Sequence, residues 1–146
     1  MGLTVKSSYA LRALYELCIL NNEGKEKVSI TELSRNQNIP RDFLEKIFSE
    51  LREADIVDSL RGRYGGYVLK KKPSEIRLSE IVAVLDKPLQ AYDCITDSCK
   101  RNVNCAVEFV WRRVYNVMMI ELDRITLQDI IDYGTNIEKH GGETSE

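Results

Sequence analysis

The chain has 146 residues and a formal net charge of −2, with 43% hydrophobic and 30% charged residues, which is ordinary for a soluble globular protein. No apolar run approaches the roughly 18–20 residues of a membrane-spanning helix, and the N-terminus lacks the apolar core of an export signal. We therefore expect a cytoplasmic protein with no membrane partner, in which clustered cysteines stay reduced and bind metal more often than they form disulfides.

Charge is distributed unevenly along the chain. Residues 1–72 carry 13 Lys and Arg against 10 Asp and Glu, whereas residues 73–146 carry 8 against 13. The basic residues concentrate at Arg61, Arg63, Lys70, Lys71 and Lys72. Because a local basic patch matters more for phosphate binding than the overall charge, the first half is the candidate nucleic-acid-binding part.

The first predicted helix spans residues 7–20. Its apolar side chains recur near helical spacing, and Cys18 is one of them. We therefore predict that Cys18 is a buried structural thiol. The run from Asn21 to Gly24 ends the helix, because Asn and Gly tolerate the left-handed backbone of a helix C-terminus.

Two shorter helices are predicted next. Ser29 followed by Glu32 is a capping-box pattern that begins a helix over residues 30–37. After a proline, a second helix is predicted from Arg41 to about Ala54, with apolar residues at three- to four-residue steps and a charged opposite face. Together these helices predict a helix-turn-helix, although an ordinary helical hairpin is the alternative.

A β-hairpin is predicted after these helices. Residues 56–60 and 67–69 form its strands, and the sequence RGRYGG at residues 61–66 forms its turn. Such a hairpin behind a helix-turn-helix is the wing of a winged helix. Its glycines allow close approach to a backbone, and its arginines can enter a minor groove or hold phosphates. The alternative is a solvated hairpin tip with scattered charge.

The second helix and the hairpin turn supply the candidate DNA-binding residues. They are Arg41, Asp42, Phe43, Glu45, Lys46, Arg61, Gly62, Arg63 and Tyr64. The helical residues are placed to meet major-groove edges or phosphates, where Glu45 can accept a hydrogen bond from a cytosine amino group. For Phe43 a partly buried position in the core is the alternative, and the two arginines of the turn are expected to contact the minor groove or the DNA backbone.

Three cysteines, Cys94, Cys99 and Cys105, lie within twelve residues, after a further short helix predicted over residues 78–86. Their C-x4-C-x5-C spacing lacks the C-x2-C pair of zinc knuckles, and the only His lies in the tail. The spacing favours a loop around a broad iron–sulfur cofactor. The alternatives are a zinc site completed by Glu108 or by a partner subunit, and thiols that serve redox chemistry or have no function.

The fourth ligand of such a cluster is less obvious. Glu108 is the first choice, because it lies three residues after Cys105 and the two would share one face of a helix. Asp93 and Asp97 are alternatives within the loop. A carboxylate binds iron less softly than a thiolate, so a cluster held in this way should be easier to lose or modify, which suits a sensor.

A long helix is predicted from Val103, because apolar residues recur at three- to four-residue steps over some twenty positions. So long a stripe favours pairing between subunits, and packing on its own winged helix is the alternative. The predicted fold is mainly α, a winged helix-turn-helix with a small β-hairpin wing and a long C-terminal dimerisation helix. Its parts are the DNA-binding domain (1–86), the cysteine loop (87–105), the dimerisation helix with a short terminal helix (106–132) and a flexible tail (133–146).

The chain resembles the Rrf-two (Rrf2) family of winged-helix transcriptional regulators, in its iron–sulfur, IscR- and NsrR-like type. The resemblance covers about residues 2–132. It is carried by the cysteine loop and by residues 8–14, 43–48, 61–67, 105–111 and 125–127. It implies a homodimer that reads a pseudo-palindromic operator in double-stranded DNA and whose cysteine loop binds a cluster, most often [2Fe–2S]. Two departures are a first cysteine gap one residue shorter than the IscR pattern, and Glu108 in place of a ligand histidine.

We therefore predict a sequence-specific DNA-binding regulator, not an enzyme, which senses cluster status, redox state or nitric oxide. One alternative is a cluster-free regulator of the same fold that responds to a metabolite or a partner protein. Another is a cytosolic redox or electron-carrier protein. That alternative leaves the wing arginines without a role, and the chain has neither a His-paired nucleophile nor a Gly-rich phosphate loop.

Overall fold

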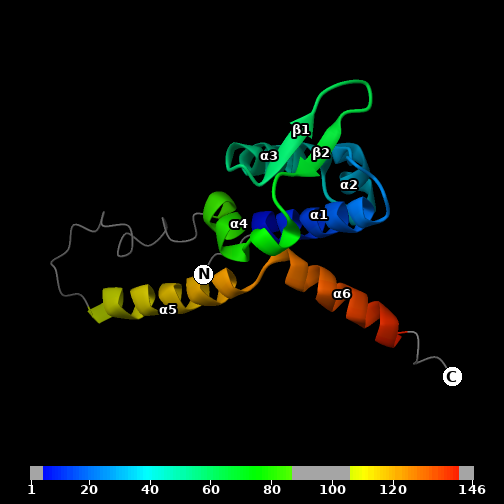
Figure 1. Ribbon diagram of the computed structural model, residues 1–146. Coiled ribbons are helices and arrows are strands. Elements are labelled where there is room, and N and C mark those ends of the chain that lie inside the picture. Colours follow the sequence, from blue (N-terminus) through cyan, green and yellow to red (C-terminus); the bar gives the residue numbers. More distant parts are fainter. Residues whose placement is uncertain (1–4, 87–105, 142–146) are drawn as a thin grey trace.

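The computed structural model describes residues 5–86 and 106–141, so the predictions made for Cys94, Cys99 and Cys105 lie outside the described residues. The fold is mainly helical with one two-stranded antiparallel hairpin, as predicted. In chain order the elements are α1 (Val5–Asn22), α2 (Ile30–Gln37), α3 (Arg41–Glu53), β1 (Val57–Leu60), β2 (Gly66–Leu69), the 3-10 helix η1 (Pro73–Glu75), α4 (Leu78–Leu85), α5 (Ala106–Arg124) and α6 (Leu127–Gly141). Figure 1 shows α5 and α6 running in different directions from one corner, on the opposite side of the molecule from the hairpin.

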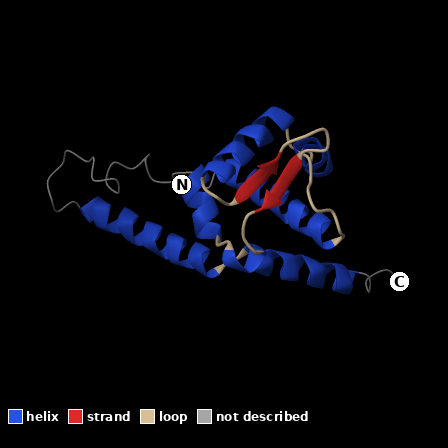
Figure 2. Cartoon of the chain, turned by 45° about the horizontal axis from the view of Figure 1, so that its top comes forward, coloured by secondary structure: helices blue, strands red, loops and turns tan. Residues whose placement is uncertain are grey.

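The core lies between α1, α2, α3, the hairpin and α4, and Figure 2 shows the hairpin lying against the helices. Leu14 of α1, Leu33 of α2 and Phe48 of α3 are completely buried. The Phe48 ring meets the Tyr67 ring of β2 edge to face, with centroids 4.9 Å apart. Because aromatic pairs favour this geometry, the contact connects the inner face of α3 to the hairpin.

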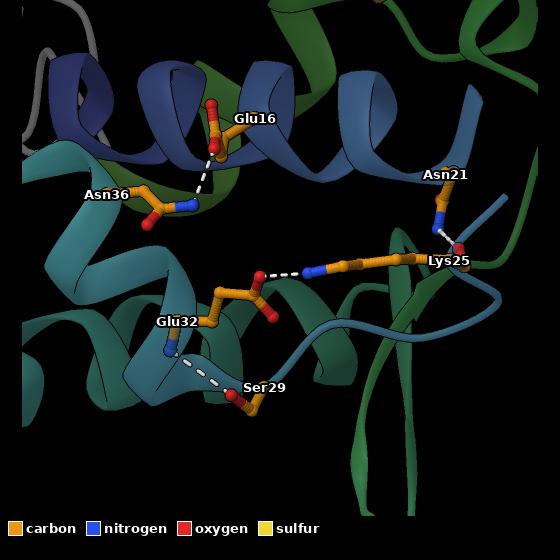
Figure 3. A network of polar contacts seen from close by, with 6 residues as sticks. All are labelled: Glu16, Asn21, Lys25, Ser29, Glu32 and Asn36. Atoms are coloured by element: carbon orange, nitrogen blue, oxygen red, sulfur yellow. Dashed lines mark hydrogen bonds and ion pairs between the residues drawn. The ribbon is translucent and has the colours of Figure 1, made fainter. Parts of the chain in front are cut away.

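Polar contacts hold α2 against α1 (Figure 3). Ser29 caps α2 as predicted, since its hydroxyl accepts a hydrogen bond from the Glu32 N–H at 3.1 Å. The Glu32 carboxylate pairs with the Lys25 ammonium, which competes with the reciprocal half of the capping box. At the end of α2, the penultimate residue Asn36 donates to Glu16 of α1 at 2.8 Å. The end of α2 is therefore connected to the supporting helix α1, and its start to the loop between α1 and α2.

The last helix is longer than predicted. Instead of ending near residue 131 and leaving a tail from 133, α6 continues to Gly141. Thr126 and Asp129 begin it, because each side chain accepts a hydrogen bond from the other's backbone N–H, at 3.3 and 2.8 Å. Gly134, a residue that usually weakens helices, stands inside it. A Cβ there would lie 2.3 Å from the Tyr15 hydroxyl of α1, so the absence of a side chain permits the close packing of α6.

Candidate nucleic-acid interface

The helix α3 has one buried and one charged face. Leu44, Ile47, Phe48 and Leu51 are all completely buried and fix its orientation. The predicted DNA-binding residues Arg41, Asp42, Glu45 and Lys46 are exposed on the other side. The burial of four apolar side chains therefore presents four charged groups to solvent on one rigid element.

Neighbouring side chains contact two of the predicted DNA-binding residues of α3, Arg41 and Phe43. The Arg41 guanidinium lies 3.2 Å from the Glu45 carboxylate one turn later, so the two charged groups orient each other. Phe43 is only half exposed, because its ring meets the Tyr9 ring edge to face at 5.7 Å between centroids. The structure thus places Phe43 between the core and the surface, as the sequence predicts.

The hairpin is held tightly beside its turn, at the start of β2. Tyr67 and Val28 exchange two backbone hydrogen bonds, of 3.1 and 2.8 Å, so the segment before α2 adds a bridge to β2. At Gly66 a Cβ would lie 2.8 Å from the Val28 carbonyl oxygen, so only glycine allows this approach. The start of β2 is therefore rigid, whereas the predicted residues of the turn before it (Arg61, Gly62, Arg63 and Tyr64) are all exposed.

A cleft of about 390 Å³ separates the hairpin from the N-terminal ends of α2 and α3. Arg41 and Glu45 line it together with backbone of both strands, whereas the residues of the wing tip from Arg61 to Tyr64 do not. Ser29 and Thr31 also line it, and sequence reasoning treated this segment only as a helix start. The capping pattern of Ser29 and Glu32 could have indicated that this segment belongs to the interface. It predicts a helix N-terminus, and the free N–H groups of a helix N-terminus attract phosphate oxygens.

The basic residues of the first half divide into paired and unpaired groups. Lys70 lies 2.6 Å from Asp55, and Lys71 lies 3.4 Å from Glu80. The hydrogen bond and the charge of Lys70 hold the pKa of Asp55 below its usual value, and Asp55 raises the pKa of Lys70 in the same way. In the described part of the chain, Arg61 and Arg63 form no ion pair. Their charges are therefore available to a nucleic acid.

Cys18 is buried on α1, with 2% of its surface exposed, which confirms the prediction of a structural thiol. Burial raises the pKa of this thiol to about 11. A group that is neutral and shielded at physiological pH is a poor nucleophile and a poor metal ligand. Cys18 is therefore unsuited to be a ligand of the predicted cluster.

We expect the stability of the protein to fall at alkaline pH because of Cys18. Its pKa in the folded protein, about 11, exceeds the usual value of 9.0, so the unfolded chain ionises first as the pH rises. The free energy of unfolding should therefore fall between about pH 9 and 11, by about 2–3 kcal/mol. Urea titrations at several pH values, with Cys18→Ala as the matched control, measure this slope. Equal slopes in both proteins would contradict the assignment.

Glu108 lies within the described residues, unlike Cys94, Cys99 and Cys105. It lies in the first turn of α5, where the Arg112 guanidinium donates two hydrogen bonds to one carboxylate oxygen, at 2.8 and 3.2 Å. The negative charge of the Glu108 carboxylate is thus balanced by Arg112 in the first turn of α5.

No group of three or more His, Cys, Asp or Glu side chains within residues 5–86 and 106–139 is arranged to hold a metal ion. Among the helices of the same described part, none is both long and apolar enough to cross a membrane. The candidate functional features of the described residues are the exposed charged face of α3 and the exposed turn of the wing.

Comparison with known families identifies this arrangement. The family model of Rrf2, described as an iron-dependent transcriptional regulator, matches residues 3–133. The chain belongs to the Rrf2 family. The matched residues of this Rrf2 protein run from the start of α1 into α6, and they include the three-cysteine segment.

Individual members of the Rrf2 family support the same assignment. An rrf2-like HTH-type transcriptional regulator of Rhodobacter capsulatus is 32% identical over 145 residues, which cover 94% of this chain and 97% of that protein. The solved structure of T. potens IscR superimposes with a TM-score of 0.74 at 25% identity, covering all of this chain and 93% of that one. CymR, the global cysteine regulator of B. subtilis, superimposes with a TM-score of 0.70 at 28% identity, over 91% and 98%. The relatives of this Rrf2 protein are transcriptional regulators rather than enzymes.

Proposed function

We propose that this Rrf2 protein is a cytoplasmic homodimer that binds a pseudo-palindromic operator through α3 and the wing. The observation that carries the proposal is the exposed charged face of α3 beside a wing tip whose arginines have no acidic partner in the described chain. The helix α3 and the hairpin lie on the side of the molecule away from α5 and α6 (Figure 1). DNA bound there would leave α5 accessible to a second subunit.

The exposed residues suggest distinct roles on DNA. Arg41 and Lys46 are placed at the N-terminal half of α3, where cations contact phosphates or guanine edges. Glu45 would discriminate by accepting a hydrogen bond from a cytosine amino group, with Arg41 orienting its carboxylate. Arg61 and Arg63, at the tip of the hairpin, would reach the adjacent minor groove or its phosphates. The helix would thus supply most of the sequence specificity and the wing most of the additional affinity.

Dimerisation is supported by the apolar surface of α5. None of its 19 residues is buried within the chain. Val107, Val110, Val114 and Val117 follow the alternating three- and four-residue spacing of a coiled-coil seam, and the first, second and fourth are 54%, 50% and 63% exposed. A stripe of this kind is stable in water only when it is covered, and an equivalent stripe on a second copy is its simplest complement. Another face of α5 packs onto the winged helix of the same chain, where Leu122 contacts the core.

We further propose that Cys94, Cys99 and Cys105 hold an iron–sulfur cluster, of [2Fe–2S] type, with Glu108 as the fourth ligand. Three thiols and one carboxylate are a chemically suitable donor set for iron. The similarity to IscR supports the same assignment. Residues 87–105 connect α4 to α5, so a group bound there would act on the helix that joins the two subunits. When bound, the cluster would supply sensitivity to iron supply, redox state or nitric oxide.

Anaerobic purification followed by iron and acid-labile sulfide analysis tests the cofactor. We expect about two iron and two sulfide per chain, as a [2Fe–2S] cluster requires. Cys99→Ser should abolish both, whereas Cys18→Ser should retain them because Cys18 is buried. Glu108→Ala should load the cluster but lose it faster in air. Iron-free protein after reconstitution, together with unaltered DNA binding by Cys99→Ser, would eliminate the sensor.

A cluster-free regulator of the same fold is the second candidate. Two observations favour it, namely the similarity to CymR, a global cysteine regulator, and the pairing of Glu108 with Arg112. Such a protein would be colourless after anaerobic purification, and cysteine substitutions would leave its regulation unchanged. Its affinity for the operator would instead change on addition of a metabolite or a partner protein.

A further inference from the structure

The corner between α5 and α6 is joined to the segment that precedes α4. The Leu78 N–H donates to the Ile125 carbonyl at 2.9 Å, and the Leu127 N–H donates to the Ile76 carbonyl at 3.0 Å. These two hydrogen bonds form an isolated antiparallel bridge outside the hairpin. Ile76 and Leu127 are almost completely buried, so the bridge is part of the core rather than a surface contact.

Asp123, in the last turn of α5, adds side-chain contacts to this corner. Its carboxylate accepts a hydrogen bond from the Ser79 hydroxyl at 2.8 Å, and its backbone carbonyl accepts one from the Arg77 guanidinium at 2.5 Å. The same guanidinium lies 3.7 Å from the carboxylate. Ser79 is only 8% exposed, so its hydroxyl has little access to water as a replacement partner. One residue of α5 is therefore held by both residues that flank Leu78.

These contacts hold the C-terminal end of α5 against the segment before α4, and so they determine the direction in which α5 leaves the core. Along the rest of α5 no side chain is buried, and Figure 1 shows the helix extending away from the core. At its other side, the corner continues into α4, whose Ile81 and Leu85 belong to the same buried cluster as Leu44 of α3. A rotation of α5 about the corner would therefore change its angle to the recognition helix, and Leu122 is the one α5 side chain that packs against the core.

We propose that Asp123 is a positioning residue that sets the angle between α5 and the winged helix, and so the half-site spacing that the dimer accepts. The inference depends on the proposed dimeric DNA-binding function. When two subunits pair through α5, the distance between their recognition helices follows from the angle at each corner. A dimer with intact corners accepts one spacing, and a dimer with loosened corners accepts several.

The test begins with the full-length protein and a random duplex DNA library. The selected wild-type operator is then remade with one or two base pairs added or removed between its half-sites, and a single half-site serves as a further probe. Asp123→Ala should reduce the preference for the native spacing by about tenfold, because it removes a hydrogen bond to a charged group. Its affinity for the half-site should stay within about twofold of wild type, because α3 is untouched. Asp132→Asn is the matched control, since this exposed carboxylate of α6 pairs only with Gln128 of its own helix among the described residues.

Two further variants separate positioning from folding. Arg77→Gln changes an exposed side chain and should reduce the spacing preference in the same direction, at an unchanged melting temperature. Asp123→Asn keeps an oxygen for the Ser79 hydroxyl and should rescue part of the preference. A folded Asp123→Ala dimer with wild-type spacing preference would overturn the inference. If the wild-type protein itself selected no paired half-sites, the proposed function would fail instead, so the two failures are distinguishable.

Discussion

Arg61→Ala should weaken operator binding by about tenfold at matched salt, and should reduce the slope of log affinity against log salt by about one. Arg61 is exposed at the wing tip and forms no ion pair in the described chain, so its whole charge is available to DNA. Its removal costs no intramolecular contact that the described structure contains. The loss of affinity would therefore report the interface rather than stability.

The measurement is a salt series of fluorescence anisotropy titrations with wild type and variant. Lys70→Ala is the matched control, because it removes an equal charge from the base of the same hairpin. Lys70 is paired with Asp55 at 2.6 Å, so its loss should change operator affinity by less than about threefold. If Arg61→Ala bound the operator as tightly as wild type at every salt concentration, the wing would have no role in DNA binding.

Val110→Glu should dissociate the dimer and lower affinity for the full operator by at least about a hundredfold. Val110 is 50% exposed in the chain and central in the proposed seam of α5. In a symmetric pair, the substitution would place two carboxylates in an apolar interface, where charges without partners are strongly unfavourable. The fold of each chain should survive, because no residue of α5 is buried within it.

Light scattering and half-site binding distinguish this effect from misfolding. The wild-type protein should have twice the mass of its 16.8 kDa chain, and Val110→Glu should have the mass of one chain with unchanged half-site affinity. Asn116→Glu is the control, because it adds the same charge to an exposed position of α5 that lines the groove towards α4. A dimeric Val110→Glu protein with normal operator affinity would show that the subunits pair elsewhere.

Local patterns in the sequence were sufficient for the elements and for much of the candidate interface. The helical spacing of Leu44, Ile47 and Leu51 predicted which face of α3 is buried, and the opposite face then carried the charged residues. The glycines and arginines of residues 61–66 predicted the turn of the hairpin. These inferences succeeded because hydrophobic periodicity and turn chemistry depend on neighbours within a few positions.

Features that depend on distant neighbours were only partly accessible. The helix α6 continues to Gly141, beyond the predicted start of the tail at residue 133, and the close packing of Gly134 against the Tyr15 hydroxyl of α1 is a contact that no local pattern indicates. The pairing of Lys70 with Asp55 likewise removed one cation from the predicted basic patch, although no local pattern joins these two residues. In both cases a contact between separate elements decided the outcome.

The sequence by itself determined the winged helix-turn-helix, the burial of Cys18 and the family to which the chain belongs. The tertiary structure alone decided the corner at which α5 leaves the core. Ser79 and Asp123 are 44 positions apart, so no periodicity or spacing rule relates them, and their hydrogen bond exists only because the bridge at Leu78 brings the two segments together. Residue types and local spacing specify elements, whereas the angles between elements arise from contacts that the chain forms only after it has folded.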